Sequence, residues 1–126
     1  MATHLTEQEQ QVLMPLEALL EGIRRRDRDA MMAQVMPEGG ATIIRAGRVL
    51  HYSLRALIER PFLEGDADEQ IYDPVILIDH DIAVIWASYK FFLNGALHHW
   101  GTDVVNLVCQ GDGKWLIAGI ADNSRT

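Results

Sequence analysis

Apolar residues recur at helical spacing near the start of the chain and at strand spacing further on. Between residues 12 and 23 they return every three or four positions, which predicts a long amphipathic helix. Thr6, followed three positions later by Glu9, has the pattern of a capping box and predicts where this helix begins. Pro15 lies inside the helix and lacks an amide hydrogen, so we expect a kink or a late helix start there.

The middle of the chain predicts short elements separated by turns. A second helix is expected to use Asp27 or Asp29 as its cap and to end before residues 36–40, MPEGG, whose proline and glycines are typical of a break. Two short strands are expected on either side of the Ala-Gly pair at 46–47. Ser53 follows them and can cap another brief helix.

After an acidic loop at residues 63–70, the chain alternates strand-like runs with turn signals. The strongest turn signal is Asn94-Gly95, because both positions of a type I′ turn need positive φ. Helices first and then antiparallel strands predict a single α+β domain over residues 1–126, with the helices on one face of the sheet. The expected strands of this half are 71–79, 82–93, 96–110 and 114–122.

The Asn94-Gly95 turn also predicts which residues face each other. If it is a two-residue turn, Leu93 lies opposite Ala96 and the pairs step outward from there. Trp86 then pairs with Asp103, and the adjacent His98 and His99 point to opposite sides of the sheet, so they cannot bind one metal ion. One predicted face carries Asp103, His99, Trp86, Ser88, Lys90, Val105 and Leu107, and the other carries Tyr89, Phe91, His98 and Trp100.

The polar middle of the Asp103 face has two explanations. A closed core would have filled it with carbon, because an unpaired buried charge costs several kcal/mol. Either the sheet curls around a cavity in which these groups meet a ligand and water, or this face is partly solvated and the aromatic face is the buried one. The spacing alone leaves both open, although the first explanation is the one we pursue.

Composition and charge exclude several classes of function. The formal charge of -7 in 126 residues provides no field that attracts phosphate backbones, so nucleic acid is not an expected partner. We expect no membrane span and a cytoplasmic location, since no apolar run approaches the roughly 20 residues that a span requires and no signal peptide begins the chain. The basic run at residues 24–28 is most simply a solvated last helical turn. No metal site or cofactor is expected, because no ligand trio or glycine-rich phosphate loop is present.

The second half of the chain resembles the nuclear transport factor 2-like superfamily, especially its small SnoaL-like and lumazine-binding-like members. The resemblance lies in an aromatic strand, a glycine turn, a strand of the form H-x-G-x-[DN]-x-x-x-L and a last strand opening W-x-I. The front half also fits through residues 22–48, so the resemblance covers nearly the whole chain. The positions that carry it are Trp86, Tyr89, Phe91, Gly95, His99, Gly101, Asp103, Leu107, Trp115 and Ile117.

This resemblance implies a cone-shaped half-barrel, in which a curved antiparallel sheet packs on three helices around a pocket. It implies that His99 and Asp103 look into the pocket, with Trp115 and Ile117 among its walls. It also implies a homodimer formed through the outer face, where Tyr89, Phe91, His98 and Trp100 are expected. The chain departs from ketosteroid isomerases, because Arg45 stands where their base would be and the first helix has no tyrosine.

Three functions are compatible with this pattern. The first is a cofactor-independent acid/base enzyme acting on a small, partly hydrophobic ligand, with Asp103 exchanging a proton and His99 or Lys90 polarising an oxygen. The second is a binding or dimerisation module whose pocket needs no titrating residue, and the third is a module that recruits another protein through its aromatic face. In the last two cases, His99 and Asp103 would only form structural hydrogen bonds.

Overall fold

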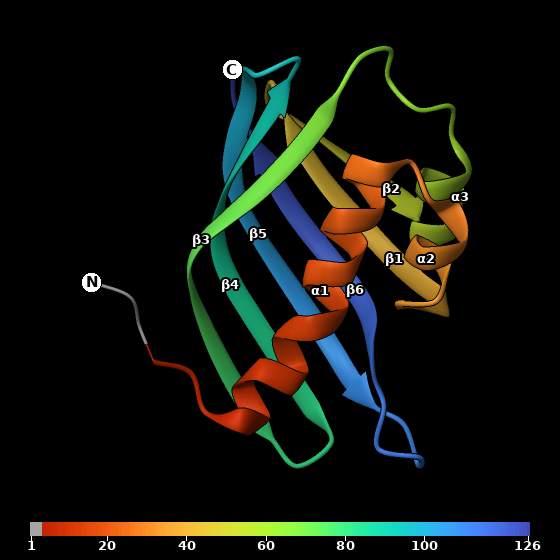
Figure 1. Cartoon of the computed structure of the whole chain (residues 1–126), viewed down its shortest axis with the longest axis vertical. Coiled ribbons are helices and arrows are strands. Elements are labelled where there is room, and N and C mark those ends of the chain that lie inside the picture. Colours follow the sequence, from red (N-terminus) through yellow and green to blue (C-terminus); the bar gives the residue numbers. More distant parts are fainter. Residues whose placement is uncertain (1–3) are drawn as a thin grey trace.

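The computed structural model describes residues 4–126 and has the predicted α+β architecture (Figure 1). Three helices lie on one face of a six-stranded sheet, which we call the inner face; the opposite, uncovered face is the outer face. The elements in chain order are α1 (Glu7–Arg25), α2 (Arg28–Met32), β1 (Val35–Arg45), β2 (Arg48–Ser53), α3 (Leu54–Glu59), β3 (Ala67–Asp79), β4 (Ile82–Leu93), β5 (Ala96–Cys109) and β6 (Trp115–Ser124).

The helix ends follow from the residues that cap them. Thr6 accepts a hydrogen bond from the amide of Glu9, and the Glu9 side chain accepts one from the Thr6 amide, so the predicted capping box is present. The helix continues without interruption through the buried Pro15, so it does not start late. Asp27 caps α2 and Ser53 caps α3, as the sequence predicted.

The strand order across the sheet is β2-β1-β6-β5-β4-β3. The pairs are antiparallel except β1 and β6, which run parallel, so the sheet is mixed. The predicted Ala-Gly turn joins β1 to β2, with positive φ at both Ala46 and Gly47. The sheet is curved and does not close into a barrel (Figure 1).

The core lies between α1 and the inner face. Alternate residues of the strands enter it, because side chains along a strand point to opposite faces. None of the helices within residues 4–126 is long and apolar enough to cross a membrane. Besides Tyr89, the largest fully buried side chains are Val12, Leu16, Ile85, Val105, Leu107 and Ile117.

Two segments predicted as loops are strand instead. The MPEGG segment is part of β1, where the pairing with β6 is irregular between Val35 and Gly40. This irregularity lets a strand contain Pro37 and two glycines, which a regular ladder disfavours. The end of the predicted acidic loop belongs to β3, which begins at Ala67 and pairs Glu69 with Phe91 of β4.

The predicted register of the β4–β5 hairpin is wrong by one residue beyond its turn. The Asn94-Gly95 turn is present, and Leu93 lies opposite Ala96 as expected. However, Phe92 pairs with Leu97 and Phe91 with His99, so His98 is an extra residue in β5, a β-bulge. Because side chains alternate between faces, this single residue exchanges the faces of β4 relative to β5.

Candidate functional site

The bulge moves several predicted pocket residues to the outer face. Trp86 is 57% exposed and pairs with Val104, whereas Asp103 is 5% exposed and pairs with Ala87. Trp86 and Asp103 therefore lie on opposite faces, and the prediction that they are neighbours inside a pocket is wrong. Ser88 and Lys90 are also exposed on the outer face, where the Lys90 ammonium lies 5.2 Å from the centre of the Tyr72 ring.

Two residues of the predicted dimer face are inside the protein. Tyr89 is 1% exposed and Phe91 is 7% exposed, because the register shift turns them toward the helices. Of the remaining two, Trp100 is 38% exposed on the outer face, whereas His98 is exposed at the bulge. The face of β4 that carries Trp86, Ser88 and Lys90 is therefore solvated, and its aromatic face is buried. This is the second of the two explanations offered for the polar pattern.

A polar cluster lies within the inner face around the Tyr89 side chain. Its hydroxyl donates a 2.6 Å hydrogen bond to the Asp122 carboxylate on β6. Asp122 is the register partner of Asp103 on β5, and the charges of both carboxyls act on the Glu69 carboxyl of β3. We call Glu69, Tyr89, Asp103 and Asp122 the carboxyl cluster. It brings together residues from four strands.

Burial raises the pKa of each carboxyl in this cluster, because water no longer solvates its charge. For Asp103, burial and the nearby charge of Asp122 raise the pKa to about 7, against a lowering by the Glu69 carboxyl. The pKa of Glu69 is raised well above its ordinary value by burial and then by the charge of Asp103. Burial also raises the pKa of Asp122, against the hydrogen bond from Tyr89 and the charge of Arg45. Protons therefore remain on this cluster near neutral pH.

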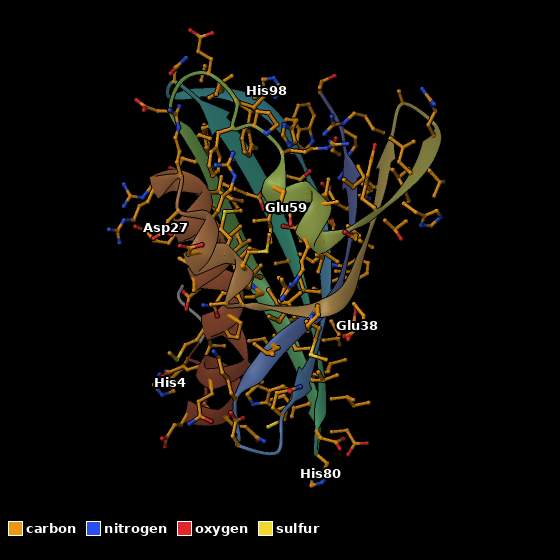
Figure 2. The ribbon with its side chains drawn as sticks, turned by 90° about the vertical axis from the view of Figure 1, so that its right-hand side faces the viewer. His4, Asp27, Glu38, Glu59, His80 and His98 are labelled. Carbon is orange, nitrogen blue, oxygen red and sulfur yellow. The ribbon has the colours of Figure 1, made fainter. Side chains whose placement is uncertain are left out.

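The two histidines lie side by side at the end of β5 nearest the hairpin turn. The His98 and His99 Nδ1 atoms are 2.9 Å apart, so the prediction that the rings point to opposite faces is wrong. The bulge turns both toward Phe91, whose ring stacks on His99 with a centroid distance of 4.7 Å. Burial, with the charges of Arg45 and His98, lowers the pKa of His99 to about 4, so its ring is neutral at pH 7. Figure 2 shows that His98 lies at the end of the sheet opposite to His80.

Arg45 is the cation that acts on this end of the inner face. Its Nε atom donates a 2.8 Å hydrogen bond to the buried hydroxyl of Ser124 on β6. From there its charge lowers the pKa of both Asp122 and His99. Asp122 thus has a donor in Tyr89 and a nearby cation in Arg45.

An apolar cavity of about 380 Å³ lies between the helices and the inner face, and it is lined by strand neighbours of the carboxyl cluster but by none of the four cluster residues themselves. Its walls come from α1, α2, α3, the α3–β3 loop and the sheet, and the cations at its edge are Arg26 and Arg60. Three sheet residues that line the cavity lie two positions from a cluster residue on the same strand. Side chains two positions apart on a strand point to the same face, so each of these pairs shares the inner face. These pairs are Ala67 with Glu69, Phe91 with Tyr89, and Ile120 with Asp122.

Two arginines of the basic run hold the loop that covers this cavity. Arg26 donates hydrogen bonds to the carbonyl oxygens of Leu63 and Gly65. Arg28 donates to the carbonyl oxygens of Ile58 and Arg60, at 3.2 Å and 2.9 Å. The guanidinium of Arg28 also lies 4.2 Å from the centre of the Phe62 ring. Both side chains are exposed, as the interpretation of a solvated run predicted, but they also bind the neighbouring segment through these contacts.

The other predicted wall residues face inward but belong to the packed core. Val105, Leu107, Trp115 and Ile117 are each at most 6% exposed and join the core cluster. They lie on the same face as Asp103, as predicted, but they do not line the cavity. No group of three or more His, Cys, Asp or Glu side chains placed to hold a metal ion occurs between His4 and Thr126.

Sequence reasoning missed Glu69, Tyr89 and Asp122 as site residues. Glu69 was placed in a loop, and Tyr89 was assigned to the outer face by the wrong register. The signal for Asp122 was available, because a carboxylate near the end of an apolar strand, after Trp115 and Ile117, needs a partner if it is buried.

No family model matches this chain, and no curated protein does. Solved structures match it over nearly its whole length. A nuclear transport factor 2-like protein of unknown function from Pseudomonas putida is 15% identical, with a TM-score of 0.80 over 96% of this chain and 89% of the other. A protein of unknown function with a cystatin-like fold from Nostoc punctiforme is 11% identical, with a TM-score of 0.76 over 98% of this chain and 96% of the other.

A ketosteroid isomerase-like protein from Erwinia carotovora atroseptica is 16% identical, with a TM-score of 0.68 over 97% of this chain and 99% of the other. At such identities the likeness is one of fold, and folds of this kind host unrelated activities. The element order, the helices on one face and the curved six-stranded sheet all agree with it. The chain therefore has the cystatin-like α+β fold that these nuclear transport factor 2-like structures share.

Proposed function

We propose that this protein binds a small, partly hydrophobic ligand in the apolar cavity on the inner face and acts on it by acid/base chemistry without a cofactor. The observation that carries the proposal is the Asp103 carboxyl, which is 5% exposed on the inner face and has its pKa raised to about 7 by burial. A group with a pKa near the working pH can both accept and donate a proton. An enclosed apolar wall with a few polar groups is the usual form of a ligand site.

The roles of the other residues follow from their positions. Asp103 is the proposed proton acceptor and donor. His99 is neutral at pH 7, so its ring can donate or accept one hydrogen bond to a ligand oxygen but supplies no charge. Lys90 drops out as a ligand group, because it is exposed on the outer face. The proposal also includes a cytoplasmic location, which cell fractionation would test.

The experiment compares wild-type protein with Asp103→Asn and the control Asp79→Asn, whose side chain is exposed at the end of β3. Native mass spectrometry identifies co-purified molecules, and a panel of ketones, epoxides and lactones is screened for thermal stabilisation and turnover. We expect Asp103→Asn to lower turnover by at least about a hundredfold while stabilisation by the ligand persists. Equal turnover in wild type and Asp103→Asn would contradict the acid/base role, and binding without any turnover would favour a binding module.

A homodimer formed through the outer face is a second part of the proposal. Val75, Trp86 and Val104 are consecutive register partners on β3, β4 and β5, and they form an apolar row across this face. Trp86 and Val75 are 57% and 55% exposed, which is unusual for large apolar side chains on a monomer surface. This row replaces Tyr89 and Phe91 as the centre of the proposed interface. The same row could instead recruit a different protein, an outcome that a monomeric wild type would favour.

A further inference from the structure

The apolar cavity carries two cations and no anion on its wall. Apart from Arg26 and Arg60, every residue that lines it in the described part of the chain is apolar. Arg26 is the C-cap of α1 and Arg60 is the C-cap of α3. A helix C-terminus favours a nearby cation, which accounts for two arginines at helix ends but not for their shared place on one cavity.

Neither arginine is neutralised by a carboxylate. Within residues 4–126 the one ion pair joins Arg24 to Glu21, so Arg26 and Arg60 have no acidic partner there. The Arg60 guanidinium lies 4.5 Å from the centre of the Tyr52 ring, and Arg26 uses only its Nη2 atom on carbonyl oxygens of the α3–β3 loop. Both side chains are exposed, so each keeps N–H donors for a further acceptor.

We propose that the ligand of this cavity is an anionic amphiphile, whose apolar chain fills the cavity and whose carboxylate binds Arg60 and Arg26 at the edge. The inference names the ligand class for the function proposed above and rests on that function only for the choice of cavity. A guanidinium matches a carboxylate in shape, because two parallel N–H groups can donate to its two oxygens.

The size of the cavity and the charge of the protein define the ligand further. A volume of about 380 Å³ is near the lower end of the range for ligand sites, so it suits a chain of medium rather than great length. The formal charge of -7 repels anions from the molecule as a whole. A preference for an anion at this cavity therefore requires cations close to the ligand, and the two arginines supply them.

The two ends of such a ligand meet different parts of the protein. Arg60 lies on the helix side of the cavity, whereas Ala67, Phe91 and Ile120 line its sheet side. Each of these three sheet residues lies two positions from a residue of the carboxyl cluster on the same strand. With its carboxylate at Arg60, the ligand therefore has its apolar chain nearest to the cluster.

The test compares octanoate, octanol and octylammonium, which share one chain and differ in the charge of the head group. Titrations of the whole protein at pH 7, followed by amide NMR, give the dissociation constant of each and the residues that respond. We expect octanoate to bind at least about tenfold more tightly than octylammonium and about threefold more tightly than octanol. The amides that respond should include those of residues 62–67 and of Phe91.

Arg60→Gln is the decisive variant, because no hydrogen bond from this exposed side chain to the loop is found within residues 4–126. It should weaken octanoate by at least about threefold and leave octanol unchanged, whereas Arg60→Lys keeps the charge and should lose less. Arg55→Gln is the matched control, because Arg55 is exposed on α3, does not line the cavity and carries the same charge. It should bind octanoate as wild type does.

Ala67→Leu locates the chain of the ligand. It adds carbon to the cavity wall, so it should weaken octanoate and octanol alike. Thermal unfolding checks that each variant is folded, and Arg60→Gln carries the test if Ala67→Leu is not. Equal binding of octanoate and octanol, equal weakening of octanoate by Arg60→Gln and Arg55→Gln, or no effect of a folded Ala67→Leu would each overturn the inference.

These titrations measure binding and not turnover, so the two proposals can fail separately. A preference for octanoate without turnover of any compound in the panel would contradict the acid/base function alone. Turnover of an uncharged compound without a preference for octanoate would contradict the anionic ligand alone.

Discussion

The buried Asp103 carboxyl links the stability of the protein to pH. Its folded pKa of about 7 exceeds the ordinary value of 3.8, so between these values the folded state binds more protons than the unfolded state. The free energy of unfolding therefore contains a contribution that is complete below about pH 4 and is lost as the pH rises through 7. Asp103→Asn should remove this dependence. The melting temperature of the variant minus that of wild type should therefore increase from pH 5 to pH 8.

Thermal unfolding at several pH values in one buffer series measures this difference. His99 acts in the opposite direction, because its lowered pKa makes the folded state lose stability as the pH falls from 6.5 to about 4. That contribution is present in both proteins and cancels in the comparison. A constant difference between variant and wild type from pH 5 to pH 8 would mean that Asp103 is not held in its neutral form.

The hydroxyl of Tyr89 is the donor for Asp122. In Tyr89→Phe the ring still fills its place, but a partly buried carboxylate loses a 2.6 Å hydrogen bond. We expect the variant to be less stable by about 1–3 kcal/mol at pH 7, the usual cost of an unpaired buried acceptor. The pKa of Asp122 should also rise, because this hydrogen bond lowers it.

Urea denaturation at pH 7 measures the change, with Tyr72→Phe as the matched control. The Tyr72 hydroxyl also hydrogen-bonds a side chain, that of Gln70, but both groups are near the surface. Its loss should therefore cost less than about 0.5 kcal/mol. Equal losses in the two variants would show that the Tyr89–Asp122 pair contributes no more than a surface contact.

Most elements of this fold could be predicted from the sequence, whereas the strand register of β4 and β5 could not. The turn at Asn94-Gly95 is signalled by residue type, and both residues have positive φ. The bulge at His98 has no such signal, because no glycine or proline marks it in residues 96–99. Since strand faces alternate with a period of two, one unmarked residue is enough to exchange them.

Residues of the site were harder to predict than the elements that carry them. Glu69 lies in an acid-rich segment of low strand propensity, and tertiary pairing with Phe91 of β4 overrides that preference. Asp103 and His99 were predicted to share one face and do so, because both follow the bulge and side chains four residues apart on a strand point to the same side. Their catalytic roles stay predictions until turnover is measured.

The α3–β3 loop is tied to α1 and α2 by arginine side chains, so its order should depend on them. In Arg26→Ala the loop loses the hydrogen bonds to the carbonyls of Leu63 and Gly65. In Arg28→Ala the loop loses the hydrogen bond to Arg60 and the contact to Phe62, and the end of α3 loses the hydrogen bond to Ile58. We expect faster hydrogen exchange in residues 60–66 of either variant, by about tenfold or more.

Hydrogen exchange followed by mass spectrometry resolves this segment. Arg25→Ala is the matched control, because Arg25 is exposed one residue before Arg26 and its side chain makes no hydrogen bond to that loop. It should leave the exchange of residues 60–66 unchanged. If all three variants exchange alike, the loop is ordered by its apolar contacts and not by the arginines.

At the scale of the whole molecule, the outer face determines the assembly state. If two copies meet through the row of Val75, Trp86 and Val104, a charge at its centre should separate them. We expect Trp86→Lys to weaken dimerisation by at least about tenfold, since a lysine would be buried without a partner. Light scattering and sedimentation over a range of concentrations measure the equilibrium.

Met14→Lys serves as the control, because Met14 is 61% exposed on α1 and away from the outer face. It should dimerise as wild type does. A wild type that is monomeric at all concentrations, or a Trp86→Lys protein that remains dimeric, would contradict the proposed interface. Loss of the dimer in both lysine variants would point to a different contact surface.

The position of β6 also has a consequence for synthesis on the ribosome. This strand is the last of the six in chain order, yet it lies between β1 and β5 and joins the two halves of the sheet. Until it emerges, β1 and β5 each have an edge without a partner, and the pairing of β1 with β6 spans most of the chain. The nascent protein therefore completes its sheet only after translation of β6, and chaperones that shield open strand edges have their greatest effect before that moment.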